Sequence, residues 1–418
     1  MRLRCAQDPR PGATPGPLSA PSARRRRAAT GAKAPLLRAL ALALALAPTG
    51  AAAAGLLQAC AADFRSLCDG TALGGGWALD CLAAQADALS PACRAALGPA
   101  QPPPAASPAA ASGCPGLALP EGPDSGADGP YPMTRRSLPD PAGGRDPVQI
   151  FAPEGAPGPR PVIFFAHGYG PNHWQGYEPL LRHLVSRGAF VVFAPFAMFG
   201  QTNDQRYDSL WQGFRAAAQA EPRMDLSRVA FLGHSFGGGA APWLAYQGLV
   251  KQGWGKNGAL LMLLAPWYAH RVTDAELAAL PANLVIAAEV YDDDRVNDHR
   301  IAIELYRHLP AGAGKYFFLA HSGRSPGCRL DADHATPGRN PSLPLKRLVL
   351  FRPLDALLAL AFDGSAAARA DLARMGSLRL AAYTPLTLEA TPTPQAPQSQ
   401  FRYRWNSPKN PRRAEASW

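Results

Sequence analysis

The sequence predicts an α/β protein in which a mostly parallel sheet is covered by helices on both faces, preceded by a small helical module held by disulfides. Two observations lead to this class. Across residues 131–383, uniformly apolar runs alternate with amphipathic stretches, as strands buried on both faces and their connecting helices require. Several closely spaced cysteines precede this region, and a segment rich in proline, alanine and glycine separates the two parts.

Residues 1–54 have the features of a signal peptide with a basic leader. A basic region that includes Arg24–Arg27 precedes the apolar run Pro35–Pro48, and small residues follow. This order is typical of a secretory signal, and we expect cleavage within Ala51–Ala54. The apolar run is too short to remain as a spanning helix. A secreted or periplasmic protein with no stable membrane span is therefore expected.

The distribution of charge supports this division. The formal net charge of the chain is +11, and residues 1–54 hold nine basic residues and one acidic residue, a net +8. Residues 55–418 therefore carry +3. Such a small excess gives no basis for nucleic-acid binding.

Residues 55–98 are predicted to form a cysteine-rich helical module. Apolar side chains recur there at helical spacing, and glycines interrupt the helical runs. Six cysteines remain once the signal is removed, an even number that is typical of disulfides in an exported chain. They are Cys60, Cys68, Cys81, Cys93, Cys114 and Cys328. A metal site is disfavoured because no C-x-x-C motif occurs and the module has no histidine.

The first four of these cysteines resemble the cysteine-rich repeat first described in a Golgi-apparatus glycoprotein. The resemblance rests on C-x-x-D-x-x-x-x-C, followed by C-L and by L-S-P-x-C-R. It implies a helical hairpin in which Cys60 pairs with Cys93 and Cys68 with Cys81, although four cysteines allow three connectivities. The module has no acid–base cluster, so we expect a spacer or a surface for a protein partner.

Two further segments are expected to lack a core of their own. Residues 99–130 read as a Pro/Ala/Gly-rich linker, and residues 384–418 as a disordered basic tail. By elimination, Cys114 in the linker would pair with Cys328 in the large domain, which would pin the linker to it.

The elements of the large domain alternate along the chain. The expected strands are 161–166, 189–196, 227–233, 258–266, 283–289 and 315–320. The expected helices are 177–188, 205–219, 237–253, 297–309 and 353–362. Helices between apolar strands predict parallel neighbours, and the carboxyl ends of such strands share one edge of the sheet.

The stretch Gly233-His234-Ser235-Phe236-Gly237 stands between a predicted strand and a predicted helix. A sharp turn at this place lifts one side chain above the sheet, and it needs small neighbours because the backbone packs against itself. The sequence therefore predicts Ser235 as a nucleophile. The alternative, a glycine-rich turn with a capping serine, is weakened by the partners available downstream.

With this motif in its context, residues 131–363 resemble the α/β-hydrolase superfamily, and more narrowly the cutinase-like and dienelactone-hydrolase-like serine esterases. The resemblance implies a Ser–acid–His order along the chain and no cofactor or metal. It also implies that an H-G pair after a strand, here His167-Gly168, precedes a backbone donor to the oxyanion. We assign that role to the N–H of Tyr169, with the N–H of Phe236 as its partner.

The acid is expected within the aspartates that follow the strand 283–289. Counting back from the next helix favours Asp293, and counting forward from the strand favours Asp292. A carboxylate there would orient the histidine and stabilise its charged form. A calcium site is disfavoured because the cluster lacks the alternation of a calcium loop.

Two histidines compete for the role of base. His334 precedes Pro337 by three residues, as in the resembling family, and lies ahead of the last predicted helix. His321 directly follows the last predicted strand. We favour His334 and keep His321 as the alternative.

Trp267 follows a strand at the place where polyester hydrolases of the resembling family carry a substrate-stacking tryptophan. Ordinary aromatic packing is the alternative for this residue.

The expected function is an exported serine hydrolase that cleaves carboxylic esters, small or polymeric, through Ser235, His334 and Asp293. Acyl transfer or perhydrolysis by the same triad, and a non-catalytic binding protein on a hydrolase scaffold, remain the other two interpretations.

Overall fold

The computed structural model describes residues 59–63, 66, 82, 89–97, 126–169, 173–197, 200–325, 328–377 and 387–395. The expected signal and the proposed Cys68–Cys81 pair lie outside these residues, as does most of the expected linker. Within the described ranges, no helix has both the length and the apolar character that crossing a bilayer requires.

A nine-stranded mixed sheet organises the large domain, with the order β1-β2-β4-β3-β5-β6-β7-β8-β11. The strands from β4 to β8 in this order run parallel, while β1, β2 and β11 pair antiparallel with their neighbours. The bounds are β1 Met133–Leu138, β2 Val148–Pro153, β3 Arg160–Ala166, β4 Phe190–Phe193, β5 Met224–His234, β6 Gly258–Leu264, β7 Leu284–Tyr291, β8 Gly314–His321 and β11 Thr387–Ala390. A separate hairpin joins β9 Gly323–Ser325 to β10 Cys328–Leu330.

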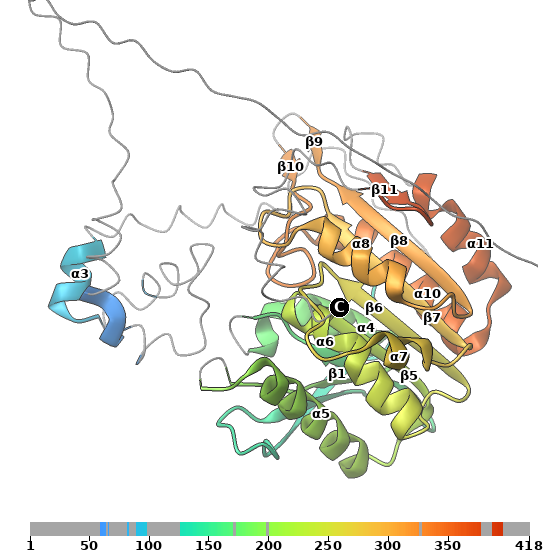
Figure 1. Ribbon diagram of the computed structural model, residues 1–418, viewed down its shortest axis with the longest axis horizontal. Coiled ribbons are helices and arrows are strands. Elements are labelled where there is room, and N and C mark those ends of the chain that lie inside the picture. Colours follow the sequence, from blue (N-terminus) through green and yellow to red (C-terminus); the bar gives the residue numbers. More distant parts are fainter. Residues whose placement is uncertain are drawn as a thin grey trace, which may run out of the picture. The chain divides into compact units, whose positions relative to one another are not determined.

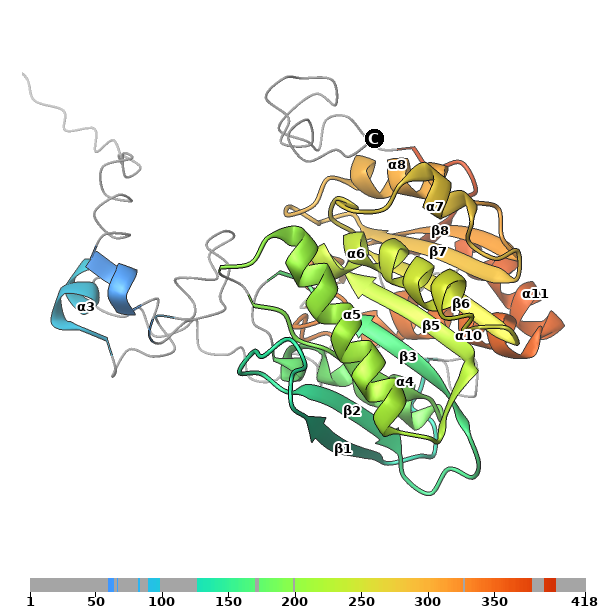
Figure 2. The same ribbon diagram turned by 60° about the horizontal axis from the view of Figure 1, so that its bottom comes forward.

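Helices cover both faces of this sheet, as Figures 1 and 2 show. One layer holds α5 Asn203–Ala220, α6 Phe236–Ala245, α7 Asp274–Ala278 and α8 His299–His308. The other holds α4 Glu178–Ser186, α9 Leu343–Lys346, α10 Arg352–Asp363 and α11 Ala366–Arg374. Short 3₁₀ segments lie at Trp174–Tyr177 and Met375–Ser377, and π-helical turns at Tyr246–Lys251 and Arg347–Phe351. The expected α/β class is confirmed.

The two layers enclose two apolar cores, one on each face of the sheet. Alternate residues of the central strands supply them: Phe231 of β5 packs on one side, and Leu232 packs on the other. Residues such as these are fully buried on both faces, which is why the parallel strands appear in the sequence as unbroken apolar runs. The carboxyl ends of these strands meet at one edge of the sheet, where polar side chains can converge.

The edges of the domain differ from the expectation. The segment 384–418 was expected to be disordered, but β11 lies within it and pairs with β8 over Thr387–Ala390. The end of the expected linker also belongs to the folded domain, because Gly129 donates its N–H to Ser186 Oγ (2.8 Å). Both segments have few apolar residues, so the pattern that predicts strands could not find them.

The described part of the cysteine-rich module is helical at 59–63 and in α3 Pro91–Leu97. A disulfide joins Cys60 to Cys93, which confirms that pair of the expected connectivity. Asp63 accepts hydrogen bonds from the N–H and the hydroxyl of Ser90 (3.2 and 2.6 Å), at the start of α3. The two helical segments are thus held together by one covalent and one polar link.

Candidate active site

Ser235 stands at the sharp turn between β5 and α6. Its backbone has φ 55° and ψ −120°, a conformation that costs a non-glycine residue on the order of 1–3 kcal/mol. Two hydrogen bonds, one to the last residue of β6 and one to the chain that follows β6, hold Ser235 in this conformation. The N–H of Ser235 donates to the carbonyl of Leu264 (3.0 Å), and the N–H of Trp267 donates to the carbonyl of Ser235 (2.8 Å). Such over-determined strain is typical of functional positions.

The glycines around Ser235 are required by close backbone contacts. A Cβ on Gly233 would lie 2.1 Å from the carbonyl oxygen of Gly237, on the opposite side of the turn. A Cβ on Gly237 would lie 2.0 Å from the carbonyl oxygen of Ala166 at the end of β3. Both distances are far inside contact range, so larger side chains would push α6 away from the sheet. The motif therefore places the start of α6 against the ends of β3 and β5.

His334 lies between the serine and a carboxylate. Its Nε2 is 3.0 Å from Ser235 Oγ, and its Nδ1 is 2.8 Å from Asp294 Oδ2. All three side chains are buried: Ser235 is 8% exposed, His334 is 7%, and the Asp294 side chain is 1%. The structure thus brings Ser235 and the favoured histidine together, with a carboxylate behind the ring. This is the contact pattern of an activated nucleophile, its base and the group that orients the base.

The carboxylate in this position belongs to Asp294, and the expectation of Asp293 must be corrected. Asp294 Oδ1 accepts the N–H groups of Val296 (2.8 Å) and Asn297 (2.9 Å), which leaves Oδ2 for His334. Asp293 instead pairs with Arg295 (3.1 Å) and with Arg329 (3.2 Å) of β10. The turn after β7 is one residue longer than the count from the following helix assumed.

Asn297 links this turn to the serine. Its side-chain amide donates to the carbonyl of Ala265 (2.7 Å), a residue that itself has a positive φ of 41°. Ala265 follows Leu264, whose carbonyl accepts the N–H of Ser235. The acid turn and the nucleophile turn are therefore joined through the exit of β6.

Asp292 and His321 form a separate pair that does not reach Ser235. Asp292 accepts the N–H and the hydroxyl of Ser322 (2.9 and 2.6 Å), and its Oδ2 is 3.4 Å from His321 Nδ1. On its other side, His321 Nε2 is 3.3 Å from Glu389 Oε2 of β11. Neither of these alternative residues is hydrogen-bonded to Ser235 or His334 in the described part of the chain. The structure gives them a role in joining β7, β8 and β11.

The aromatic rings of the two residues expected to donate to an oxyanion, Tyr169 and Phe236, pack against each other at the start of α6. Phe236 is the first residue of α6, so its N–H lies outside the helical hydrogen-bond ladder. Its ring is buried and packs against Phe196 (centroids 5.1 Å) and edge-on to Tyr169 (5.9 Å). Tyr169 is 41% exposed, and the Arg206 guanidinium lies 5.1 Å from its ring centroid. An aromatic surface that reaches solvent at Tyr169 therefore lies next to the serine.

Trp267 touches the site through its main chain, in the bond to the Ser235 carbonyl given above. Its ring is only partly buried and packs edge-on against Tyr268, with centroids 4.6 Å apart. A stacking role towards a substrate stays a prediction for this side chain.

Two residues at the site were not given a function by sequence reasoning: Tyr177 and His234. Tyr177 Oη is 2.7 Å from His234 Nδ1 and accepts the N–H of Gly168 (3.0 Å). His234 Nε2 is 2.9 Å from the carbonyl oxygen of His334. The signal for His234 was its place next to the nucleophile, whereas nothing in the sequence around Tyr177 pointed to the site.

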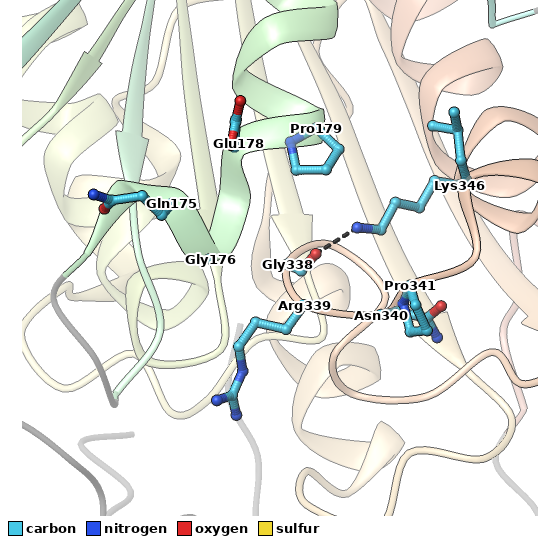
Figure 3. Close-up of a pocket in the computed structure, with 10 residues that line it drawn as sticks. Gln175, Gly176, Glu178, Pro179, Gly338, Arg339, Asn340, Pro341 and Lys346 are labelled. Atoms are coloured by element: carbon cyan, nitrogen blue, oxygen red, sulfur yellow. Dashed lines mark hydrogen bonds between the residues drawn. The ribbon is translucent and has the colours of Figure 1, made fainter. Parts of the chain in front are cut away.

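A surface pocket of about 500 Å³ lies beside the segment that carries His334, between the start of α4 and residues 338–346 (Figure 3). The Lys346 side chain is 2% exposed and donates a hydrogen bond to the carbonyl of Gly338, drawn in Figure 3. Burial lowers the pKa of Lys346 to about 8, although Asp333 opposes the shift. This bond ties α9 to the chain just after His334.

The chain between the two histidines is also covalently restrained, because Cys328 of β10 is disulfide-bonded. The remaining described cysteines, Cys60 and Cys93, bond to each other, so the partner of Cys328 lies outside the described residues. Cys114, the partner expected by elimination, is one of those outside.

Within the described ranges, no group of three or more His, Cys, Asp or Glu side chains has an arrangement that could hold a metal ion. The site is instead organised around one serine, one histidine and one buried carboxylate. No protein-family model matches the chain, and no curated protein matches it. The functional argument therefore depends on the geometry of the site.

Proposed function

We propose that the chain is a serine hydrolase that cleaves carboxylic esters through an acyl-enzyme formed on Ser235. The observation that carries the proposal is the position of His334, within hydrogen-bond distance of both Ser235 Oγ and Asp294 Oδ2. The strained backbone of Ser235 and the order of the parallel strands are compatible with the α/β-hydrolase fold that the sequence resembles.

The proposed reaction proceeds in two halves. Ser235 Oγ attacks the ester carbonyl carbon while His334 Nε2 takes its proton. The C–O bond to the alcohol breaks, and His334 returns the proton to the leaving oxygen. Water then attacks the acyl group with the same histidine as base, which releases the acid and restores Ser235. Asp294 holds the imidazole with its Nδ1–H towards the carboxylate and stabilises the positive charge that forms.

The arrangement of backbone donors supplies the second part of the proposal. The negative oxygen of the tetrahedral intermediate would be bound by the N–H of Phe236 and the N–H of Tyr169. Each such donor contributes about 3 kcal/mol to lowering a barrier of this kind. Neither step needs a cofactor.

The residues around the site and the disulfide extend the proposal to the class of ester and to the compartment. The aromatic surface at Tyr169 and Phe236 suits an apolar acyl chain or an aromatic ester better than a charged one. Export to an oxidising compartment is supported by the Cys60–Cys93 disulfide. The cysteine-rich module would then act as a spacer or would bind a protein partner.

A fluorophosphonate probe tests the proposal directly on the oxidised chain without residues 1–54. Covalent labelling of the wild type that disappears in Ser235→Ala supports it, and hydrolysis of a p-nitrophenyl ester should disappear in the same variant. Absence of both labelling and hydrolysis in a folded wild type would favour a binding protein on a hydrolase scaffold. If the acyl group is transferred to an added alcohol or peroxide faster than to water, the proposed reaction becomes acyl transfer or perhydrolysis.

A further inference from the structure

Three buried aromatic side chains connect the two halves of the candidate site: His167, Tyr177 and His234. His167 follows β3, Tyr177 precedes α4, and His234 ends β5. The ring of His167 is fully buried, and those of Tyr177 and His234 are 8% and 5% exposed. The catalytic mechanism proposed above uses none of them. Their polar atoms nevertheless lie in an unbroken series of hydrogen bonds.

The series begins at His167, passes through Gly168, and ends at His334. His167 Nδ1 is 2.8 Å from the carbonyl oxygen of Gly168, and the N–H of Gly168 donates to Tyr177 Oη (3.0 Å). Tyr177 Oη is 2.7 Å from His234 Nδ1. His234 Nε2 is 2.9 Å from the carbonyl oxygen of His334.

The chemistry of the end groups fixes the direction of every bond. A carbonyl oxygen only accepts, so His234 must carry its proton on Nε2 and donate it to His334. In the neutral ring, Nδ1 then only accepts, so the Tyr177 hydroxyl must donate to it. By the same reasoning His167 must carry its proton on Nδ1. All four bonds therefore run in one direction. The three bonds from the Gly168 N–H to the His334 carbonyl follow one another through the Tyr177 hydroxyl and the His234 ring, an arrangement in which neighbouring bonds strengthen one another.

The charge states required by this arrangement are those that burial favours. Burial lowers the pKa of His167 to about 4, and the hydrogen bond to Gly168 opposes this only in part. Burial also lowers the pKa of His234 well below its ordinary value, and the neighbouring His334 and His167 rings add to the effect. Burial raises the pKa of Tyr177, which keeps its hydroxyl protonated. Both histidines are thus neutral near pH 7.

We propose that Tyr177 and His234 are positioning residues that hold the oxyanion-binding loop and the main chain of the catalytic histidine at a fixed separation around Ser235. The proposal rests on the hydrolase function proposed above and deepens it. Gly168 precedes Tyr169, and a Cβ on Gly168 would lie only 3.2 Å from Ser235 Cβ, so the loop passes directly over the nucleophile. His334 is held at its carbonyl, which is attached to the same Cα as the side chain that takes the proton.

His167 orients the peptide that carries the proposed oxyanion donor. The carbonyl of Gly168 and the N–H of Tyr169 belong to one planar peptide unit and point in opposite directions. A hydrogen bond from His167 to that carbonyl therefore sets the direction of the Tyr169 N–H, the proposed oxyanion donor. The chain of bonds links this donor to the base without touching the substrate.

Packing makes the central link rigid. The Tyr177 ring packs edge-on against Phe165 with centroids 4.9 Å apart, and a Cβ on Gly338 would lie 3.2 Å from its Cε1. Gly338 belongs to the segment that follows His334, and the Lys346 ammonium holds its carbonyl (Figure 3). The hydroxyl of Tyr177 therefore has little freedom to leave the chain.

The first test is spectroscopic and does not depend on activity. The full signal-free chain, labelled with ¹⁵N at histidine, is examined by long-range ¹H–¹⁵N correlation between pH 5.5 and 8, with resonances assigned through His167→Gln and His234→Gln. We expect His234 as the Nε2–H form and His167 as the Nδ1–H form, neither titrating. The opposite form in either ring, or titration of His234 in this range, overturns the bond chain.

The second test measures positioning through the separation of kcat and KM on a p-nitrophenyl ester. Tyr177→Phe removes two links, and we expect kcat to fall about 10- to 100-fold with KM changed less than about threefold. Tyr306→Phe is the control. Tyr306 of α8 also has little exposed surface, but its ring packs on Phe317 of β8, away from the bond chain, and kcat should stay within about twofold of wild type.

Rescue by a conservative variant separates positioning from simple packing. His234→Gln can still place an N–H near the His334 carbonyl, whereas His234→Leu cannot. We expect kcat of His234→Gln to exceed that of His234→Leu by about tenfold at similar thermal stability. Equal kcat in these two variants, or an unchanged kcat in Tyr177→Phe, refutes the positioning role. If the wild type neither reacts with the fluorophosphonate probe nor hydrolyses the ester, the hydrolase function is refuted instead. The histidine tautomers measured in the first test then decide by themselves whether the series of hydrogen bonds exists.

Discussion

Two histidine–carboxylate pairs lie at the carboxyl ends of β7 and β8, and they differ in almost everything but composition. His334 and Asp294 are both buried, their bond is 2.8 Å long, and the other nitrogen of the ring faces a serine. His321 and Asp292 are 29% and 25% exposed at their side chains and 3.4 Å apart, and the ring faces a second carboxylate, Glu389. Of the two pairs, only the first has its histidine within hydrogen-bond distance of a serine hydroxyl, as the proposed mechanism requires.

The comparison shows that a nearby carboxylate does not by itself mark a base. In the second pair, the hydrogen bond to Asp292 raises the pKa of His321, and Glu389 adds to this against partial burial. A histidine between two carboxylates is stabilised as a cation, which makes it a poor acceptor near neutral pH. The position of the serine and the depth of burial distinguish the two pairs.

Replacing each histidine in turn is the strongest test of the difference between the two pairs. His334→Ala should lower kcat/KM by about 10³-fold or more, since among the described residues His334 is the base that is hydrogen-bonded to the Ser235 hydroxyl. His321→Ala should leave it within about threefold. Ester hydrolysis and the rate of fluorophosphonate labelling measure both effects. A larger loss in His321→Ala would reverse the assignment of the base.

Replacing adjacent aspartates sharpens the assignment of the acid. Asp294→Asn should lower kcat by about 10²- to 10⁴-fold, because the amide would favour the wrong histidine tautomer. Asp293→Asn serves as the control one residue away, and its kcat should stay within about threefold because its partners are Arg295 and Arg329. Comparable losses in the two variants would contradict the assignment of Asp294 as the partner of His334.

Glu289 lies on β7, ahead of the two aspartates, and has no histidine partner among the described residues, so its replacement should stabilise the protein where replacement of a paired group destabilises it. Its side chain is fully buried, and burial raises its pKa to about 8, with the Tyr291 hydroxyl opposing in part. Because the folded value lies above the unfolded one, the stability linked to this group is lost as pH rises from about 4.5 to 8.

Glu289→Gln should therefore raise the free energy of unfolding at pH 8.5 by on the order of 2 kcal/mol, with a much smaller change at pH 5. Urea denaturation at the two pH values measures this. An equal change at both values would mean that the carboxyl is ionised in the folded protein.

The smallest expected effect concerns the exposed pair itself. Since the pKa of His321 is raised in the folded state, its stabilisation is complete below the ordinary histidine pKa of about 6.5 and disappears as pH rises through the folded value. His321→Gln should cost about 0.5–1 kcal/mol at pH 5.5 and almost nothing at pH 9, as for other partly exposed ion pairs. Thermal denaturation across this range is sufficient. A cost that stays constant with pH would indicate packing rather than charge.

The sharp turn at Ser235 could be predicted because its signal is local. Gly233, Ser235 and Gly237 lie within five consecutive residues, and the strand and helix that flank them follow the expected periodicities. The apolar central strands were predictable for the same reason, since burial on both faces leaves a direct mark on the sequence.

The carboxylate that lies beside His334 could not be predicted, because the position of each aspartate depends on distant partners. Asp292, Asp293 and Asp294 are consecutive and chemically identical, but Ser322 holds the first and Arg329 the second. Only the third turns inward, where the N–H groups of Val296 and Asn297 cap it. No count along the chain contains these long-range contacts.

The edge strands were missed for a different reason. β1 exposes most of its residues, and β11 has only four residues with a glutamate among them, so neither shows an apolar run. Their strand conformation comes from hydrogen bonds to a neighbour that is already in place rather than from burial of their own side chains.

β11 also decides what the border of the sheet presents to other molecules. Without it, the outer side of β8 over Phe318–His321 would offer unpaired N–H and carbonyl groups beside the buried side chains of Phe318 and Ala320. Such a row is a template onto which a second chain can add a strand. A truncation before Thr387, chosen to remove a supposedly unstructured tail, would thus invite dimers and aggregates while leaving the serine and its partners in place.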